Sequence, residues 1–178
     1  MRSRFLPEGR LLHTPENEAA CASRDGLRRA MEEETVLEGV AQLCDGAHNL
    51  LVSVGPFTGF LPREEAALGI AEGTTREIAI LSRVGKPVCF QITALEESEG
   101  VLRPRLSRRR AQQAALDAML AGLHPGCILP AVVTHLESFG AFVDIGCGVP
   151  SLIGIENISV SRIPHPDPVS YTHLPSPR

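Results

Sequence analysis

The nine residues SFGAFVDIG, at positions 138–146, place two phenylalanines three positions apart with a glycine between them. The whole chain contains only six Phe, one Tyr and no Trp, so two rings this close in sequence need a reason. Successive side chains of a regular β-strand point to opposite faces, which would send Phe139 and Phe142 apart. They share a face only if the backbone bulges at Gly140, and glycine inside a strand is a common sign of such a bulge.

The small aliphatic residues Ala141, Val143 and Ile145 share one face of this strand, and we expect that face to be the interior of the fold. Phe142 then lies outside. With the bulge, Phe139 joins Phe142 on the outside, and the pair makes a platform on which flat rings can stack. Without the bulge, Phe139 points inward and closes the hydrophobic core at the mouth of a β-barrel.

The strand pattern extends on both sides of this stretch. Residues 126–159, GCILPAVVTHLESFGAFVDIGCGVPSLIGIENIS, predict three strands with turns near Glu137–Ser138 and Gly146–Pro150. An earlier segment, EGVAQLCDGAHNLLVSVGPFTGFLP at 38–62, repeats the order of strand, polar turn, strand, Gly/Pro turn and strand. We therefore predict an internal repeat whose second copy begins near His124.

The first copy continues to completion. Residues 63–84 predict a connection with a helical turn, and GKPVCFQITALEESEGVLRPRLS, from Gly85 to Ser107, predicts two strands around a polar turn at Glu96–Gly100. Five short strands with a helical stretch between the third and fourth indicate a small antiparallel barrel.

Two helical segments flank this barrel in sequence. Thr14 and Pro15 are a good helix start, and Gly26 is expected to divide the first segment into two short helices. After the barrel, Ser107 is a candidate cap for a second segment, SRRRAQQAALDAMLAGL. Its apolar residues fall at helical spacing, which predicts a face docked on the barrel. These residues are Leu116, Met119, Leu120 and Leu123.

Together these residues resemble the RNA-binding domain named after ribosomal protein S-one, an OB-fold barrel. The second copy matches the opening half of that family's pattern, a Gly-led strand followed by F-G-A-F-V-D and a third strand. The matching residues are Gly126, Phe139, Gly140, Ala141, Phe142, Val143, Asp144, Leu152, Ile155 and Arg162. The first copy matches the closing half in VGKPVCFQITALEESEGVLRPRLSRR, residues 84–109.

The resemblance implies a mainly β fold with helical linkers, built from tandem five-stranded antiparallel OB-fold barrels. We expect residues 1–34 to be helical or irregular, 35–109 to form the first repeat and 110–123 the linker helix. Residues 124–163 then form a second repeat of about three strands, and 164–178 a Pro-rich tail that is non-native or disordered. The prolines at 164, 166, 168, 175 and 177 exclude a central strand there.

The resemblance also implies that single-stranded RNA stacks on Phe139 and Phe142. The first copy has His48 and Leu51 at these two positions, which predicts a mainly structural role for it. The family histidine of the third strand falls on Gly154 in the second copy.

Four further residues are weaker candidates for RNA contacts. Arg162 is a candidate phosphate or base contact and His135 a candidate base contact, each with a solvated or purely structural role as the alternative. Arg103 and Arg105 alternate on a predicted strand and so share a face. They form either a phosphate-binding stripe or salt bridges to nearby glutamates.

Charge is distributed unevenly along the chain. Residues 1–100 hold 10 basic and 16 acidic side chains, whereas residues 101–178 hold 7 basic and 5 acidic ones. Five of the arginines lie within RPRLSRRR at 103–110, a strip able to contact phosphates in a salt-sensitive way.

Other function classes lack sequence support. The chain has no P-loop, nucleophile-elbow or H-E-x-x-H motif, and its five cysteines form no C-x-x-C pair. We expect no enzyme activity, metal or cofactor, and a cytoplasmic protein without a membrane span. The expected partners are single-stranded RNA and the small ribosomal subunit. The alternatives are a protein–protein interaction module on the ribosome or an accessory piece of a larger RNA-processing enzyme.

Overall fold

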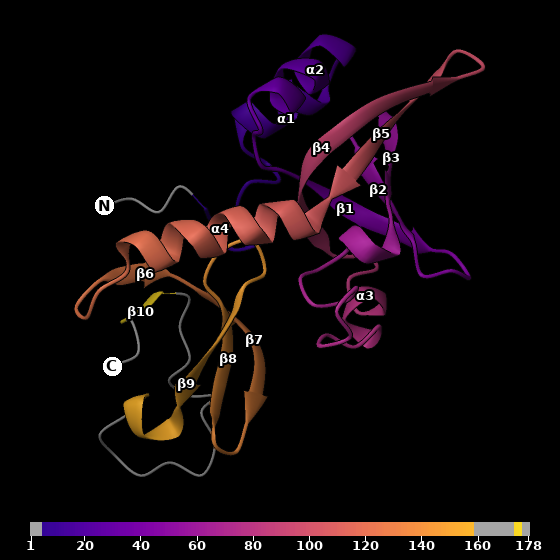
Figure 1. Ribbon diagram of the computed structural model, residues 1–178. Coiled ribbons are helices and arrows are strands. Elements are labelled where there is room, and N and C mark those ends of the chain that lie inside the picture. Colours follow the sequence, from indigo (N-terminus) through magenta and orange to yellow (C-terminus); the bar gives the residue numbers. More distant parts are fainter. Residues whose placement is uncertain (1–4, 159–172, 176–178) are drawn as a thin grey trace. The chain divides into compact units, whose positions relative to one another are not determined.

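The computed structural model describes residues 5–158 and 173–175 (Figure 1). It divides into two compact units, one formed by residues 8–114 and the other by residues 1–7 and 115–178. The fold is mainly β: a closed five-stranded barrel lies in the first of these units and a three-stranded antiparallel sheet in the second.

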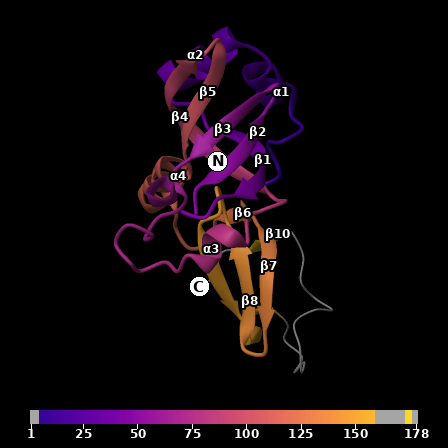
Figure 2. The ribbon, with the colours of Figure 1, turned by 90° about the vertical axis from the view of Figure 1, so that its right-hand side faces the viewer.

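The barrel strands follow the order β1-β2-β3-β5-β4, and β4 pairs with β1 to close the ring (Figures 1 and 2). This order is OB-like. Every pair is antiparallel except β3 with β5, which pair in parallel where Phe60 lies opposite Arg105. The barrel is therefore antiparallel except at this seam, where β3 and β5 run in the same direction. The strands are β1 (Leu37–Cys44), β2 (Leu50–Val54), β3 (Phe57–Leu61), β4 (Pro87–Ser98) and β5 (Val101–Ser107).

The barrel interior is aliphatic. Along β2, Leu50, Val52 and Val54 are fully buried, whereas Leu51 and Ser53 between them are half-buried on the other face. This alternation with a period of two is what a strand with one inner and one outer face requires. Phe90 is the one aromatic residue among the largest fully buried side chains of the described part of the chain.

Between β3 and β4 the chain forms a short 3-10 helix, Arg63–Glu65, and the single-turn helix α3, Ile78–Leu81. The predicted helical turn in this connection is confirmed.

Two short helices precede the barrel, as predicted: α1 (Pro15–Cys21), capped by Thr14, and α2 (Arg24–Glu32). The division lies at Ser23, whose hydroxyl accepts from the Gly26 N–H at 3.1 Å. Gly26 itself lies inside α2, so its predicted role as the break is wrong. A Cβ at Gly26 would lie 2.6 Å from the Ala20 carbonyl oxygen, so the missing side chain lets α2 start close against the end of α1.

The helix α4 (Arg108–Gly122) follows β5 directly. The Ser107 hydroxyl accepts from the Arg110 N–H at 3.0 Å, which confirms the predicted cap.

The predicted buried face of α4 is wrong at its C-terminal end. Leu120 is 76% exposed and Leu123 44% exposed, whereas Ala111 and Ala115 have no exposed surface. The buried positions belong to the first turns of the helix, where small alanine side chains permit close packing. Of the predicted face, Leu116 and Met119 are half-buried, Leu120 is exposed, and Leu123 lies beyond the end of the helix.

The second unit contains the three expected strands as the sheet β7-β8-β9 (Figure 2). Its core is small: Ala131, Val143 and Ile153 form a buried cluster, and Ala141 on β8 is buried as well. The short strands β6 and β10 pair separately, and proline at the end of β10 is tolerated in a pair of this kind. The bounds are β6 (Ile128–Pro130), β7 (Val132–Glu137), β8 (Gly140–Asp144), β9 (Pro150–Gly154), a 3-10 helix (Ile155–Asn157) and β10 (His173–Pro175).

Two buried glutamates tie the segment before α1 to the barrel unit. Glu8 accepts from Arg108 Nη2 at 2.5 Å and Nε at 3.0 Å, and from the Cys89 N–H at 2.8 Å. Burial raises the pKa of Glu8, but Arg108 and Arg83 outweigh it, so the pKa lies below its ordinary value. This carboxylate is a paired, hydrogen-bonded buried charge, which is the form a protein interior accepts.

Glu38, on β1, has the opposite electrostatic environment. Its side chain accepts from the Gly9 N–H at 2.8 Å, and no arginine pairs with it among the described residues. Burial is the main cause that raises its pKa to about 7, and the Glu8 charge adds to that effect. The folded state therefore favours the protonated form of Glu38. The contribution of this group to stability is fully present below pH 4.5 and is lost as pH rises to about 7.

We predict that Glu38→Gln removes a pH dependence of stability between pH 4.5 and about 7. Wild type loses stability as pH rises through that window, by up to about 3 kcal/mol. The glutamine variant has no proton to lose, so it is the more stable form at pH 8. Urea unfolding across this pH range measures the difference.

The exposed Glu33→Gln variant is the matched control, because Glu33 lies at the C-terminal end of α2 in solvent. A Glu38→Gln variant whose stability falls with pH as steeply as that of wild type and Glu33→Gln contradicts the prediction.

Candidate nucleic-acid interface

Three ring-bearing side chains gather on the outer face of the β7-β8-β9 sheet. His135 on β7 lies opposite Phe142 on β8, and their ring centroids are 6.2 Å apart with planes tilted by 31°. Phe139 meets Phe142 edge-on, with centroids 6.2 Å apart and planes at 85°. We call His135, Phe139 and Phe142 the ring cluster.

The two phenylalanines share a face, as predicted, but the predicted bulge at Gly140 is wrong. Gly140 pairs regularly with Glu137 and with Gly154. Phe139 lies instead in the turn between β7 and β8, where side-chain direction no longer follows strand alternation. Phe139 is 53% exposed, so it does not close the hydrophobic core.

The irregularity in this hairpin belongs to β7. Its register against β8 shifts between Val133 and His135, so Thr134 has no partner of its own in the ladder. The shift turns His135 to the same outer face as Phe142.

Gly140 has a different purpose from the one predicted. A Cβ at this position would lie 2.2 Å from the Ile153 carbonyl oxygen, a backbone atom of β9. The glycine therefore allows β8 and β9 to approach at the start of the strand that carries Phe142.

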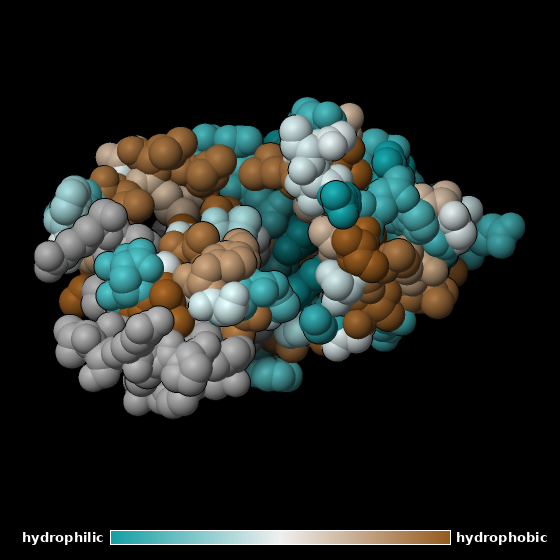
Figure 3. All heavy atoms as spheres, turned by 90° about the horizontal axis from the view of Figure 1, so that it is seen from below, coloured by the Kyte–Doolittle hydropathy of each residue, from teal (hydrophilic) through white to brown (hydrophobic). Residues whose placement is uncertain are grey.

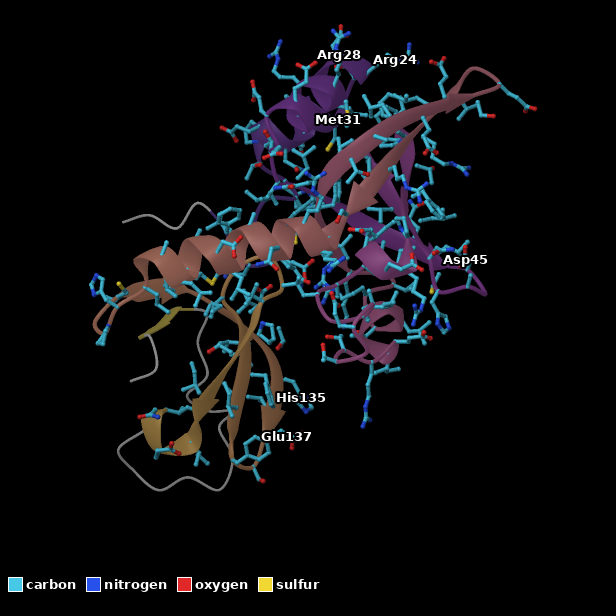
Figure 4. The ribbon with its side chains drawn as sticks, in the orientation of Figure 1. Arg24, Arg28, Met31, Asp45, His135 and Glu137 are labelled. Carbon is cyan, nitrogen blue, oxygen red and sulfur yellow. The ribbon has the colours of Figure 1, made fainter. Side chains whose placement is uncertain are left out.

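His135 also contacts a carboxylate on its own strand. Its Nε2 lies 2.6 Å from Glu137 Oε1, and both side chains project from β7 (Figure 4). This pair sets the orientation of the imidazole beside Phe142. When the imidazole is protonated the contact is an ion pair, and both side chains are exposed.

Asp144 does not join Phe142 on the outer surface, although strand parity puts the two on one face. It is 5% exposed, and its Oδ1 accepts from the Gly146 N–H at 2.8 Å and the Gly148 N–H at 2.9 Å. Its carboxylate thus holds the turn between β8 and β9 and leaves the ring cluster without an adjacent acidic group on β8.

The two candidate arginines of the barrel lie on the outer face of β5. Arg105 contacts Glu96 at 3.4 Å, and its guanidinium carbon lies 5.7 Å from the centroid of Phe60. Arg103 lies opposite Glu96 in the ladder but forms no ion pair with any residue in the described part of the chain. Both belong to the unit of residues 8–114, whereas the ring cluster belongs to the other unit. Arg162 lies outside the described residues.

Sequence reasoning missed Phe60. Its signal is visible in TGFLP: Gly59 and Leu61 are the inner pair of β3, so Phe60 between them faces outward. The family pattern instead puts Leu51, the residue opposite Phe60 on β2, at the position of Phe142.

Hydrophobic side chains reach the surface in the view of Figure 3. Exposed large apolar residues include Leu43 (54%) on β1 and Leu152 (43%) on β9, opposite Phe142.

Over residues 5–158 and 173–175, the acidic, histidine and cysteine side chains form no group able to hold a metal ion. In the same part of the chain, every helix is too short or too polar to cross a bilayer.

Similarity to known proteins is distant but extends over most of the chain. Small ribosomal subunit protein bS1 of Neisseria meningitidis serogroup B is 27% identical over 149 residues, which cover 80% of this chain and 24% of the relative. The protein of the same name from Mycobacterium tuberculosis strain H37Rv is 28% identical over 167 residues, 91% of this chain and 32% of the relative. The chain is a distant homologue of bS1.

The bS1 protein of Rickettsia typhi is 33% identical over 82 residues, 45% of this chain and 14% of that protein. The chain thus spans between about a seventh and a third of the length of these three bS1 proteins. No family model matches the sequence.

We predict that Gly140→Ala destabilises the β7-β8-β9 sheet. The new methyl group would overlap the Ile153 carbonyl oxygen, and the backbone of β9 has to move away. The expected cost is about 1–3 kcal/mol, typical of overpacking. Chemical denaturation followed by circular dichroism measures it.

Gly122→Ala is the control, because a Cβ at Gly122 meets nothing within 4 Å and alanine favours helix. A Gly140→Ala variant as stable as Gly122→Ala would show that β9 does not restrict this position.

Proposed function

We propose that the chain binds single-stranded RNA, and that Phe139 and Phe142 each stack on an unpaired base. The observation that carries the proposal is the ring pair of Phe139, which is 53% exposed, and Phe142, which is half-buried, in edge contact on the outer face of an antiparallel sheet. Distant homology to a ribosomal protein over most of the chain supports the same assignment.

Stacking suits this geometry because the two rings stand nearly perpendicular. One base cannot lie flat on both rings, so each ring accepts its own base and the RNA backbone turns between the two bases. Stacking on an aromatic side chain contributes about 1–3 kcal/mol per base and tolerates any sequence. His135 beside Phe142 adds a hydrogen-bonding group at the edge of the second base.

We further propose that the chain contains two S-one-type OB domains in tandem, at 35–109 and 124–163, the second incomplete. The registers of the two three-stranded segments support this. β1 skips one residue against β2 between Ala41 and Leu43, and β7 skips one against β8 between Val133 and His135. The skip falls at the same place in both hairpins, and an unskipped strand pair follows in each.

The bound RNA is proposed to be messenger RNA at the small ribosomal subunit, in the cytoplasm. The support is the printed name of the relatives, a small ribosomal subunit protein. The proposed mechanism is binding alone, with no bond made or broken.

The test is RNA binding by the double variant Phe139→Ala/Phe142→Ala. Removal of both rings is expected to weaken binding of a fluorescein-labelled single-stranded oligouridylate at least about tenfold, the equivalent of one stacked base. Fluorescence anisotropy measures the affinity. A second variant, Phe139→Leu/Phe142→Leu, preserves apolar volume but has no flat ring, and it should lose affinity as well.

Leu120→Ala is the matched control, because Leu120 is an exposed apolar residue that belongs to α4 and to none of the strands. Circular dichroism establishes that each variant is folded. Equal affinity of the wild type, the ring variants and Leu120→Ala would rule out stacking on these rings.

A further inference from the structure

Two polar side chains of β7 form a pair beside Phe142. His135 and Glu137 are two positions apart on this strand, so they share its outer face (Figure 4). Their contact joins His135 Nε2 to Glu137 Oε1 at 2.6 Å. In the ladder Glu137 lies opposite Gly140, so no side chain directly across on β8 competes for its carboxylate.

We propose that His135, with its hydrogen held on Nε2 by Glu137, recognises the edge of the base on Phe142 and selects cytosine or adenine over uracil. The selected feature is an exocyclic amino group. This selectivity rests on the proposed function, since it requires a base stacked on Phe142. It adds what stacking lacks, because an aromatic ring accepts every base. His135 is then the specificity-determining residue and Glu137 a positioning residue.

The hydrogen between the two side chains belongs to the imidazole. An ionised carboxylate only accepts hydrogen bonds, so Nε2 is the donor to Glu137 Oε1. A neutral imidazole carries a single hydrogen, and its other nitrogen, Nδ1, is then an acceptor. Within residues 5–158 and 173–175, no hydrogen bond uses Nδ1 of His135. The side chain is 63% exposed, so this lone pair is left for a ligand.

The position of the imidazole suits a contact with the edge of a stacked base. Its centroid lies 6.2 Å from that of Phe142, and the two ring planes differ by only 31°. A base stacked on Phe142 is parallel to that ring, so the imidazole is close to parallel with the base as well. The exocyclic groups of the base project beyond the ring that stacks, and a hydrogen bond of about 3 Å spans the remaining distance to His135.

Cytosine and uracil are the two bases that this acceptor separates best. They have the same size, and both stack. At ring position 4, cytosine has an amino group, which donates, whereas uracil has a carbonyl oxygen, which only accepts. The amino group forms a hydrogen bond with Nδ1 of His135, but the carbonyl oxygen places one lone pair against another and leaves both acceptors unpaired. Adenine also has an exocyclic amino group, N6, so it is selected together with cytosine.

The polar groups around the imidazole are engaged within the protein. The charged residue of β8, Asp144, accepts from the backbone of the turn that follows this strand, and β9 carries no charged residue. Thr134, the neighbour of His135 on β7, donates its hydroxyl to the Phe142 carbonyl oxygen at 3.2 Å. Hydrogen bonding to the edge of a base on Phe142 therefore falls to His135.

The experiment compares two fluorescein-labelled RNAs, oligocytidylate and oligouridylate, each of roughly 12 nucleotides, within the site size of one OB-fold. Fluorescence anisotropy with the full chain measures both affinities. The measurement is made at pH 8, above the ordinary imidazole pKa of about 6.5. Wild type is expected to bind oligocytidylate about fivefold more tightly than oligouridylate, the equivalent of one hydrogen bond.

Two variants test the two roles. His135→Phe keeps a flat ring beside Phe142 but has no acceptor, so it should bind the two RNAs with equal affinity and bind oligouridylate as tightly as wild type does. In Glu137→Gln the new amide is also able to donate, so the imidazole hydrogen is no longer held on Nε2. Its preference should fall to about twofold or less. Glu156→Gln is the matched control, because this exposed carboxylate of the same unit contacts Asn157, and it should keep the full preference. Circular dichroism establishes that the variants are folded.

Equal affinity of wild type for the two RNAs, or a preference for oligocytidylate that survives in His135→Phe, would overturn the proposal. A full preference in Glu137→Gln would overturn the role of Glu137. The Phe139→Ala/Phe142→Ala variant separates this selectivity from stacking. If that variant loses affinity for both RNAs while wild type shows no preference, stacking stands and recognition by His135 fails. If it keeps both the affinity and the preference of wild type, no base lies on Phe142 and the proposed function fails as well.

Discussion

Aliphatic side chains cover the inner face of both sheets, and this constraint determines which side chains of each strand face outward. Once Leu50, Val52 and Val54 are buried, the residues between them must point to the outer face, because successive side chains of a strand point to opposite faces. Cross-strand pairing then brings the outward residues of neighbouring strands into rows. His135 and Phe142 reach the outer face in this way, whereas Phe139 lies in the turn between β7 and β8 and does not follow strand alternation.

Much of this could be predicted from sequence because the signals are local. Turn residues and alternating aliphatic positions predicted the strands of the barrel, and Thr14 and Ser107 predicted two helix caps. The outward direction of Phe142 followed from the small residues on either side of it. Each of these depends only on neighbours along the chain.

The errors arose where the deciding contact is distant in sequence. Gly26 and Gly140 were interpreted as points of backbone irregularity, but each is small because another backbone segment approaches it, at Ala20 and at Ile153. Phe60 was overlooked because its meaning depends on Arg105, which follows 45 positions later and meets it through the parallel seam of the barrel. A pattern along one strand does not show what lies across it.

The two units also differ in how their outer faces relate to their cores. The barrel has a large aliphatic interior and a closed ring of strands, and Phe60 on its outer face is half-buried. Within the described part of the chain, the second sheet has a smaller core, in which Ala131, Val143 and Ile153 form one cluster and Ala141 is also buried, and it has two strand edges. Phe139 there is 53% exposed instead of adding to that core. A small core that leaves a ring outside points to use of that ring at the surface, which is the physical basis for assigning it a ligand.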